Sequence, residues 1–151
     1  MRIVLDTNVL VSALISKGTP PALLYEAWSR GDFQLVTSAA QIDELRRVLA
    51  YDRLRSYIAA TDAQTLSETI SAAAVVVEDL PEVHVASDED DNAILATAIA
   101  SCADLIVTGD KSHLLTLESV EGIPIVTPRA ALDRLGGGPD KGLTRGTPSD
   151  E

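Results

Sequence analysis

Short β-branched apolar segments alternate with segments of helical periodicity along most of this chain. The first of them, RIVLD at residues 2–6, runs directly into helical sequence, and the alternation continues to residue 135. Strands that are apolar throughout are typical of a sheet buried on both faces, and strands that alternate with helices are typically parallel. The sequence therefore predicts an α/β fold with a parallel sheet covered on both faces by helices.

The predicted elements fill residues 1–135, which we expect to form one domain. Five strands are expected at residues 2–6, 33–38, 74–80, 103–110 and 123–128. Helices are expected over 8–16, from a cap at Thr19 to Gly31, after a cap at Thr37 or Ser38, from Asp52 to about Ala73, and over 89–102, 111–117 and 128–135. Residues 136–151 are rich in Gly and Pro without apolar periodicity, and we expect a disordered tail there.

Composition and charge exclude several classes of protein. The single Cys102 excludes an intramolecular disulfide framework and a cysteine-based zinc cluster. No apolar run approaches the roughly 20 residues of a membrane span, and Asp6 and Asn8 interrupt the one N-terminal stretch that is similar to a signal peptide, so a cytoplasmic protein is expected. The net charge of −11 opposes binding to a phosphate backbone, unless cations or clustered basic residues compensate locally.

Two acids follow predicted strands directly. Asp6 ends the first strand in VLDTN, and Asp110 follows the fourth in LIVTGD. The carboxyl ends of parallel strands meet at one edge of a sheet, where ligands bind in such folds. Asp6 on its own, like Thr7 or Asn8, could also be a helix cap. Two acids at equivalent strand ends favour a site.

Four consecutive acids at residues 88–91 precede another helix. Ser87 or Asp88 suits the N-cap, and acids in the first turn suit the helix dipole. Capping and solvation therefore explain Asp88, Glu89 and Asp90 without any site.

Helix phase separates the last acid from the others. At about 100° per residue, Asp91 lies on the apolar side with Ile94, whereas Asp90 points with Thr97 and Ser101 toward solvent. A carboxylate on a buried face needs a partner or a metal. Asp91 is therefore the acid of this run that we expect to carry chemistry.

Glu44 is a fourth candidate, on the flank of its helix's apolar stripe; a surface Glu paired with a nearby Arg is the alternative. Carboxylates that converge on one pocket repel one another, and a hard divalent cation such as Mg²⁺ relieves that repulsion. His84 and His113 are not spaced in the sequence as two ligands of one metal ion would be.

Four arginines lie within ten residues: Arg46, Arg47, Arg53 and Arg55. They form either a solvated helix face or a phosphate-binding patch. Arg46 and Arg47 are the candidates for binding phosphate.

As a set, these residues resemble the PIN-domain family, and most closely its VapC-like toxin–antitoxin branch. The matching pieces span residues 2–135: IVLDTNVLVSAL, SAAQIDELRRVL, DEDDNAILATAIASCADLIVTGDKSHLL and IPIVTP. The resemblance implies a Rossmann-like three-layer α/β/α sandwich and an endoribonuclease that depends on Mg²⁺ or Mn²⁺. Its implied partners are an RNA substrate and a cognate antitoxin, and PIN domains often form homodimers.

The resemblance also assigns roles by position. Asp6, Glu44, Asp91 and Asp110 match the family's four acids, and Asp6, Asp91 and Asp110 are the expected metal ligands. Asn8 matches a polar residue that supports the first acid, and Thr108 matches a small hydroxyl residue beside the fourth. Asp88 or Asp90 could replace Asp91 if the register of the acidic run differs.

Two other functions remain compatible with the residues alone. An acid after the first strand also occurs in phosphotransfer and phosphatase-type α/β proteins, but a haloacid-dehalogenase-like phosphatase requires a second acid where Asn8 stands. A receiver domain has its phosphoacceptor later in the chain than Asp6. A non-catalytic interaction module, in which the acids serve only as caps, is the third interpretation.

Overall fold

Six strands form one sheet in the order β3-β2-β1-β4-β6-β5. The computed structural model describes residues 1–109 and 113–136. Five strands are parallel: β1 (Arg2–Leu5), β2 (Gln34–Ser38), β3 (Val75–Val77), β4 (Leu105–Val107) and β6 (Ile123–Val126). The predicted α/β class and the five parallel strands are confirmed.

The sixth strand, β5 (Ser119–Val120), was not predicted. It pairs antiparallel with β6 at the edge of the sheet, with Val120 opposite Ile123. The two residues between them, Glu121 and Gly122, both have positive φ, as a tight two-residue hairpin turn requires. A strand of two residues is too short to produce an apolar alternation, and Glu-Gly is a weaker turn signal than Asn-Gly or Asp-Gly.

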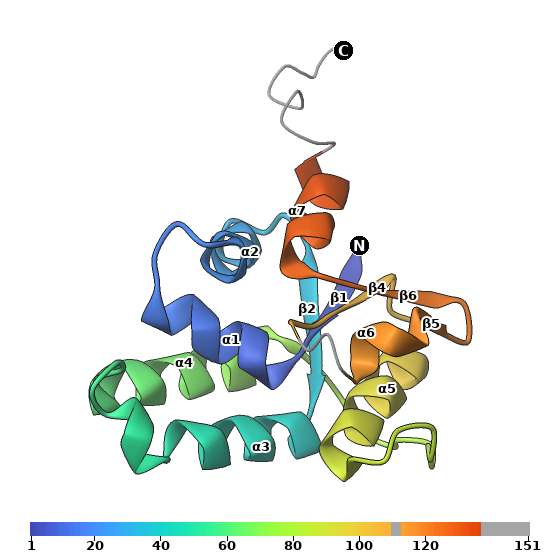
Figure 1. Cartoon of the computed structure of the whole chain (residues 1–151), viewed down its shortest axis with the longest axis horizontal. Helices are drawn as coiled ribbons and strands as arrows, with labels where there is room; N and C mark the ends of the chain where they lie inside the picture. Colours follow the sequence, from blue (N-terminus) through green and yellow to red (C-terminus); the bar gives the residue numbers. More distant parts are fainter. Residues whose placement is uncertain (110–112, 137–151) are drawn as a thin grey trace.

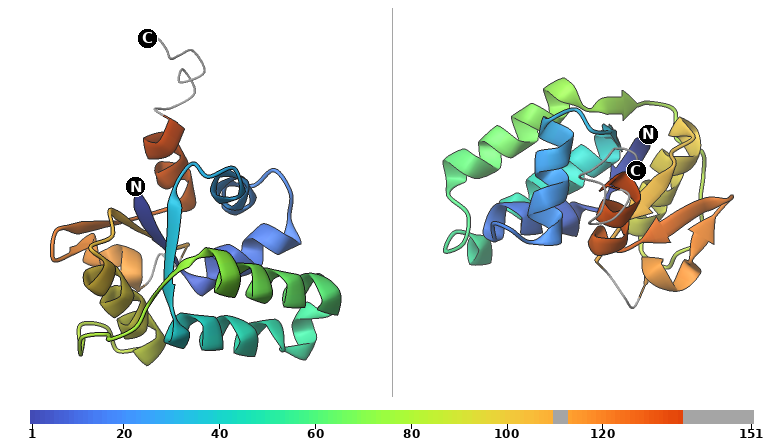
Figure 2. Two further views of the ribbon diagram at one scale, coloured as in Figure 1. Left: turned by 180° about the vertical axis from the view of Figure 1, so that it is seen from behind. Right: turned by 90° about the horizontal axis from the view of Figure 1, so that it is seen from above.

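Helices cover both faces of the sheet, so the three-layer architecture is also confirmed. One face is covered by α1 (Thr7–Ile15), α2 (Pro20–Ser29), α3 (Ala39–Leu49), α4 (Ala60–Ala73) and α7 (Pro128–Gly136), and the other by α5 (Glu89–Ser101) and α6 (Leu114–Leu117). Figure 1 shows α1–α4 on one side of the strands and α5 and α6 on the other, and Figure 2 shows the same separation from behind and from above.

Strand β1 shows why both faces must be covered. Ile3 and Leu5 point into the core beneath α1–α4, whereas Val4 points into the core beneath α5 and α6. All three side chains are almost fully buried. An apolar strand with no polar alternation is therefore the consequence of its central place in the sheet, between β2 and β4.

The boundaries differ from the predictions in a few places. The helix expected from Asp52 to about Ala73 is a short 3-10 turn, η1 (Asp52–Leu54), followed by α4 from Ala60. Ser38 rather than Thr37 caps α3, because its hydroxyl accepts a hydrogen bond from the Gln41 amide. Helix α7 includes Gly136, and residues 137–151 of the expected tail lie outside the described residues.

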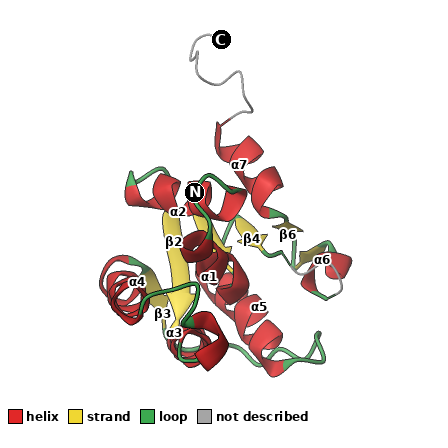
Figure 3. Ribbon diagram, turned by 60° about the vertical axis from the view of Figure 1, so that its left-hand side comes forward, coloured by secondary structure: helices red, strands yellow, loops and turns green. Residues whose placement is uncertain are grey.

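The order of the strands identifies the edge at which a site is expected. From β1 the chain proceeds to β2 and β3 on one side and later to β4 and β6 on the other. In open parallel sheets ligands bind outside the carboxyl ends of the strands where this direction reverses, which here is between β1 and β4. Figure 3, coloured by secondary structure, shows helices around the strands of the sheet. Within the described part of the chain, no helix is long and apolar enough to cross a membrane.

Candidate active site

Asp6 lies at the reversal point, directly after β1. The register Leu5↔Val107 places it beside Thr108, the residue that follows β4. The Thr108 hydroxyl donates a hydrogen bond of 2.7 Å to Asp6 Oδ2, and both residues are buried, with Asp6 only 6% exposed. Asp6 occupies the N-cap position of α1, but its side chain makes no capping hydrogen bond. Helix capping therefore does not explain this carboxylate.

Glu44 approaches the same region from α3. The Thr7 hydroxyl donates a hydrogen bond of 2.7 Å to Glu44 Oε1, which joins the start of α1 to α3. Desolvation of this half-buried side chain raises its pKa from 4.5 to about 6; the Thr7 hydrogen bond opposes the shift, and the charges of Asp90 and Asp6 add to it. Arg47, the nearby Arg of the alternative interpretation, forms its ion pair with Asp90, and its charge lowers the pKa of Glu44 only as the smallest of these effects.

The acidic run divides at the start of α5. Asp88 is the N-cap, and its Oδ1 accepts a hydrogen bond of 2.8 Å from the Asp90 amide. Asp90 pairs with Arg47 at 2.9 Å on the surface. That carboxylate is the main cause of the raised pKa of the Arg47 guanidinium. Glu89 is exposed, whereas Asp91 is half-buried and faces the cavity that contains Asp6 and Glu44.

Asp91 lies on the side of α5 that helix phase predicts, but the prediction that the opposite side of α5 faces solvent is wrong. Thr97 and Ser101, expected at the solvent face, are buried. The Thr97 hydroxyl donates to the Ala93 carbonyl and shares a hydrogen bond of 2.8 Å with Ser38 at the end of β2. The α5 helix contacts α3 as well as several strands, so more than one of its sides is covered.

One cavity of about 290 Å³ brings the acids together. It is lined by residues of α1, α3, η1 and α5 together with the end of β1: Asp6, Thr7, Asn8, Val11, Ser12, Glu44, Val48, Arg53, Leu54 and Asp91. Asn8 is exposed on this rim, and its side-chain oxygen would lie 3.9 Å from a Cβ built on Gly109, after β4. The structure therefore brings Asp6, Asn8, Glu44 and Asp91 to one place, with Thr108 behind Asp6.

Asp110, the fourth predicted acid, lies outside the described residues. Within the described ranges, no group of three or more His, Cys, Asp or Glu side chains is arranged to hold a metal ion. The predicted metal set of Asp6, Asp91 and Asp110 contains only two described residues, which line one cavity together with Glu44.

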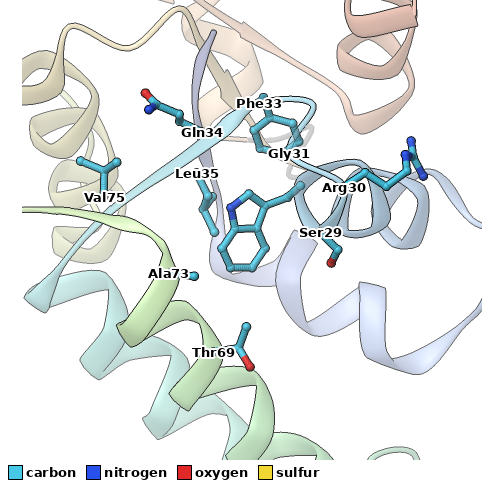
Figure 4. A pocket seen from close by; sticks show the side chains of 10 residues that line it. Ser29, Arg30, Gly31, Phe33, Gln34, Leu35, Thr69, Ala73 and Val75 are labelled. Carbon is cyan, nitrogen blue, oxygen red and sulfur yellow. The ribbon is translucent and has the colours of Figure 1, made fainter.

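A larger cavity lies elsewhere on the molecule and lacks this chemistry. Its volume is about 620 Å³, and Figure 4 shows its lining, which includes Phe33, Leu35 and Val75. It lies near the amino end of β2, where Gly31 and Gln34 contribute to it, and no Asp or Glu is among its lining residues. The smaller acidic cavity is therefore the better candidate for catalysis.

The sequence interpretation missed three residues that hold the site in place. Thr7, which the sequence presents only as a possible cap, orients Glu44. Buried Gln41 donates to the Leu5 carbonyl, at 3.1 Å, directly before Asp6. Buried Asn92 forms two hydrogen bonds with the backbone of Ala86, of 2.8 and 2.9 Å, and so fixes the loop before Asp91. For Thr7 and Asn92 the available signal was a polar residue directly after a candidate acid, whereas Gln41 has no candidate acid beside it in the sequence.

Arg46 and Arg47, the predicted phosphate-binding pair, have partners on the protein. Arg47 is paired with Asp90, and Arg46 donates to the Ser71 hydroxyl on α4 at 3.3 Å. Neither residue lines the acidic cavity, whereas Arg53 from the same cluster does. Their role in RNA binding stays a prediction.

Sequence comparison with known proteins identifies the family to which this chain belongs. Residues 2–112 match the family model of the PIN domain. The chain is also 29% identical over 112 residues to the uncharacterized protein MJ1680 of Methanocaldococcus jannaschii. The aligned residues cover 74% of this chain and 72% of MJ1680.

Solved structures share the fold at lower identity. A chain of VapBC2 from Rickettsia felis, bound to a promoter DNA fragment, superposes with a TM-score of 0.57 at 13% sequence identity. The match covers 84% of this chain and 98% of the VapBC2 chain. PAE2754 from Pyrobaculum aerophilum has a TM-score of 0.57 at 18% identity, covering 91% and 90%. FitAcB from Neisseria gonorrhoeae has a TM-score of 0.52 at 18% identity, covering 84% and 98%. The family match over most of the chain and the shared fold show that this protein belongs to the PIN-domain family.

Proposed function

We propose that this protein is an endoribonuclease that uses Mg²⁺ or Mn²⁺ to hydrolyse RNA phosphodiester bonds. The observation that carries the proposal is the convergence of Asp6, Glu44 and Asp91 on one cavity. They come from β1, α3 and α5, which are distant in sequence, and they meet where the sheet order reverses. Caps and solvated surface acids do not require such convergence, so it favours an enzyme over an interaction module.

The donor chemistry of the cavity fits a hard divalent cation. Its acidic side chains offer only oxygen ligands, which Mg²⁺ and Mn²⁺ prefer. The charges of Asp6 and Asp90 disfavour ionisation of Glu44, and a bound cation would relieve that repulsion. Asp6 and Asp91 would hold the ion, together with Asp110. When bound, such an ion activates water and stabilises the leaving oxygen of a phosphodiester.

The protein's own residues orient these carboxylates and move protons. Thr108 and Thr7 donate to Asp6 and Glu44 and so fix the orientation of each carboxylate. Because its pKa is about 6, Glu44 is mostly ionised at neutral pH and can accept a proton from an attacking water. Asn8, on the rim, offers an amide to support Asp6 or the substrate.

We further propose that the protein is the toxin of a toxin–antitoxin pair. The resemblance to the VapC-like branch and the shared fold with VapBC2 and FitAcB support a cognate antitoxin. A homodimer and a cytoplasmic location are part of the same proposal. The homodimer can be tested by light scattering on the purified protein, and the location by cell fractionation.

Cleavage of RNA by wild type and Asp91→Asn tests the enzymatic proposal. The substitution removes a charge at the cavity but preserves side-chain shape, so we expect near-complete loss of cleavage with Mn²⁺ or Mg²⁺. Glu89→Gln is a matched control, because Glu89 is an exposed acid in the same helical turn, and we expect wild-type cleavage from it. Equal cleavage by wild type and Asp91→Asn, with both proteins folded by circular dichroism, would show that the site is wrong.

A further inference from the structure

An RNA substrate must approach an acidic cavity on a protein with a net charge of −11. Each phosphate that nears Asp6, Glu44 and Asp91 is repelled, and a metal ion inside the cavity acts on the scissile group alone. A basic side chain on the rim would lower this electrostatic cost for a neighbouring phosphate. Among the described residues that line the cavity, Arg53 is the only Lys or Arg.

The rest of the arginine cluster is directed elsewhere. Arg47 is paired with Asp90 at 2.9 Å, and Arg46 donates to Ser71 at 3.3 Å. Arg55 donates to the backbone carbonyls of Leu49 and Ile58, which ties η1 to the end of α3. These contacts leave Arg53 as the member of the cluster that faces the acids.

Arg53 is held by an aromatic ring. Its Cζ lies 4.8 Å from the centroid of the exposed Tyr51 ring, two residues earlier in the chain. A guanidinium above an aromatic face is attracted by the π electrons, which leaves its N–H donors available in its own plane. Within the described residues, Arg53 has no ion pair closer than 4 Å. The pair thus presents an oriented fork of donors beside the acids.

We infer that Arg53, positioned by Tyr51, binds a backbone phosphate of RNA next to the scissile bond; this rests on the proposed ribonuclease function. A planar guanidinium matches two phosphate oxygens at once, which an ammonium does not. The phosphate at Arg53 fixes how far the strand extends past the cavity and therefore which linkage reaches the acids. Arg53 is a binding residue, and Tyr51 is a positioning residue.

Binding of a fluorescein-labelled, single-stranded RNA 20-mer of mixed sequence tests the inference. Anisotropy is measured in EDTA over a range of salt concentrations, with wild type and these variants: Arg53→Ala, Arg53→Lys, Tyr51→Leu, Arg30→Ala, Arg46→Ala and Arg47→Ala. For Arg53→Ala we expect about tenfold weaker binding and a salt slope reduced by about 0.7, the value for one phosphate contact on a single strand. Arg53→Lys should retain the slope with intermediate affinity, and Tyr51→Leu should do the same.

The controls separate this inference from the function on which it rests. Arg30 is exposed, is paired with Asp32 and lines the larger cavity at the amino end of β2, whereas the acids line the other cavity, and Arg30→Ala should match wild type. An unchanged slope for Arg53→Ala overturns the inference, as does a reduced slope for Arg46→Ala or Arg47→Ala instead. If wild type cleaves RNA and Asp91→Asn does not, but Arg53→Ala cleaves with wild-type KM, only the inference fails. If wild type cleaves no RNA with either metal, the proposed function fails.

Discussion

Replacing Glu44 by Gln should make the protein more stable at neutral pH than the wild type. The pKa of Glu44 is raised from 4.5 to about 6, chiefly by desolvation, so the folded state binds a proton more tightly than the unfolded state. Between these two values the folded state carries more protons, and the free energy of unfolding therefore falls as pH rises. Below pH 4.5 Glu44 is protonated in both states and its titration contributes no difference.

The size of the effect follows from the shift. Raising the pKa from 4.5 to about 6 corresponds to about 2 kcal/mol, and partial exposure of the side chain to solvent reduces this to about 1 kcal/mol. Gln cannot ionise, and its side-chain oxygen still accepts the Thr7 hydrogen bond. The free energy of unfolding of Glu44→Gln should thus rise by about 1 kcal/mol relative to that of wild type as the pH increases from 4 to 7.5.

Urea unfolding at several pH values, in EDTA to exclude metal, measures this difference directly. Asp43→Asn is the matched control, because it replaces the exposed carboxylate next to Glu44 on α3, and its stability should stay within about 0.5 kcal/mol of wild type. A difference between Glu44→Gln and wild type that stays constant from pH 4 to pH 7.5 would refute the reasoning, because it would mean that folding does not perturb Glu44.

Two further predictions concern buried hydroxyls. Thr108→Val keeps the side-chain shape but removes the hydrogen-bond donor to buried Asp6. It should lower the free energy of unfolding by about 2 kcal/mol at pH 7. Thr65→Val, at an exposed position, is the control and should change little in the same urea assay. Ser38→Ala and Thr97→Val each remove the 2.8 Å hydrogen bond between β2 and α5. A double-mutant cycle should therefore give a coupling energy of about 1 kcal/mol between them. If the two losses of stability are strictly additive, this hydrogen bond does not contribute.

The parts of the site that sequence could predict are those that depend on periodicity and strand order. Asp6 was identifiable because it follows a wholly apolar strand, and a parallel sheet brings strand ends to one edge. Asp91 was identifiable because helix phase puts it on the side of Ile94, and it does face the cavity. Both arguments need only the local pattern and the fold class.

The sides of α5 were harder to predict for a physical reason. Apolar periodicity treats Thr97 and Ser101 as surface residues, but each hydroxyl hydrogen-bonds a backbone carbonyl of its own helix. Such local hydrogen bonds reduce the cost of burial, so a helix packed against both a sheet and α3 can bury them. Small hydroxyl residues therefore do not mark a solvent face when a helix is covered on more than one side.

Pairs that join distant elements were not predictable from pattern. The Thr7–Glu44 hydrogen bond joins residues 37 positions apart, and no periodicity relates them. The direction of each arginine between residues 46 and 55 depends on where α3 ends and η1 turns, which involves the contacts of Arg55 with two carbonyls. A cluster of like charges in sequence thus separates in space, and its members acquire different neighbours.

The same separation explains how four adjacent acids are tolerated. Asp88 accepts a backbone hydrogen bond, Asp90 is paired with Arg47, Glu89 is exposed, and Asp91 faces the cavity. Each charge meets a different environment, so repulsion within the run is offset at the helix N-terminus and by one surface arginine. Net charge is then a poor guide to substrate: the chain is strongly acidic, yet one of the described residues that line the acidic cavity is an arginine, Arg53. Whether the protein binds RNA depends on that local arrangement, and the salt dependence of the Arg53 variants measures it.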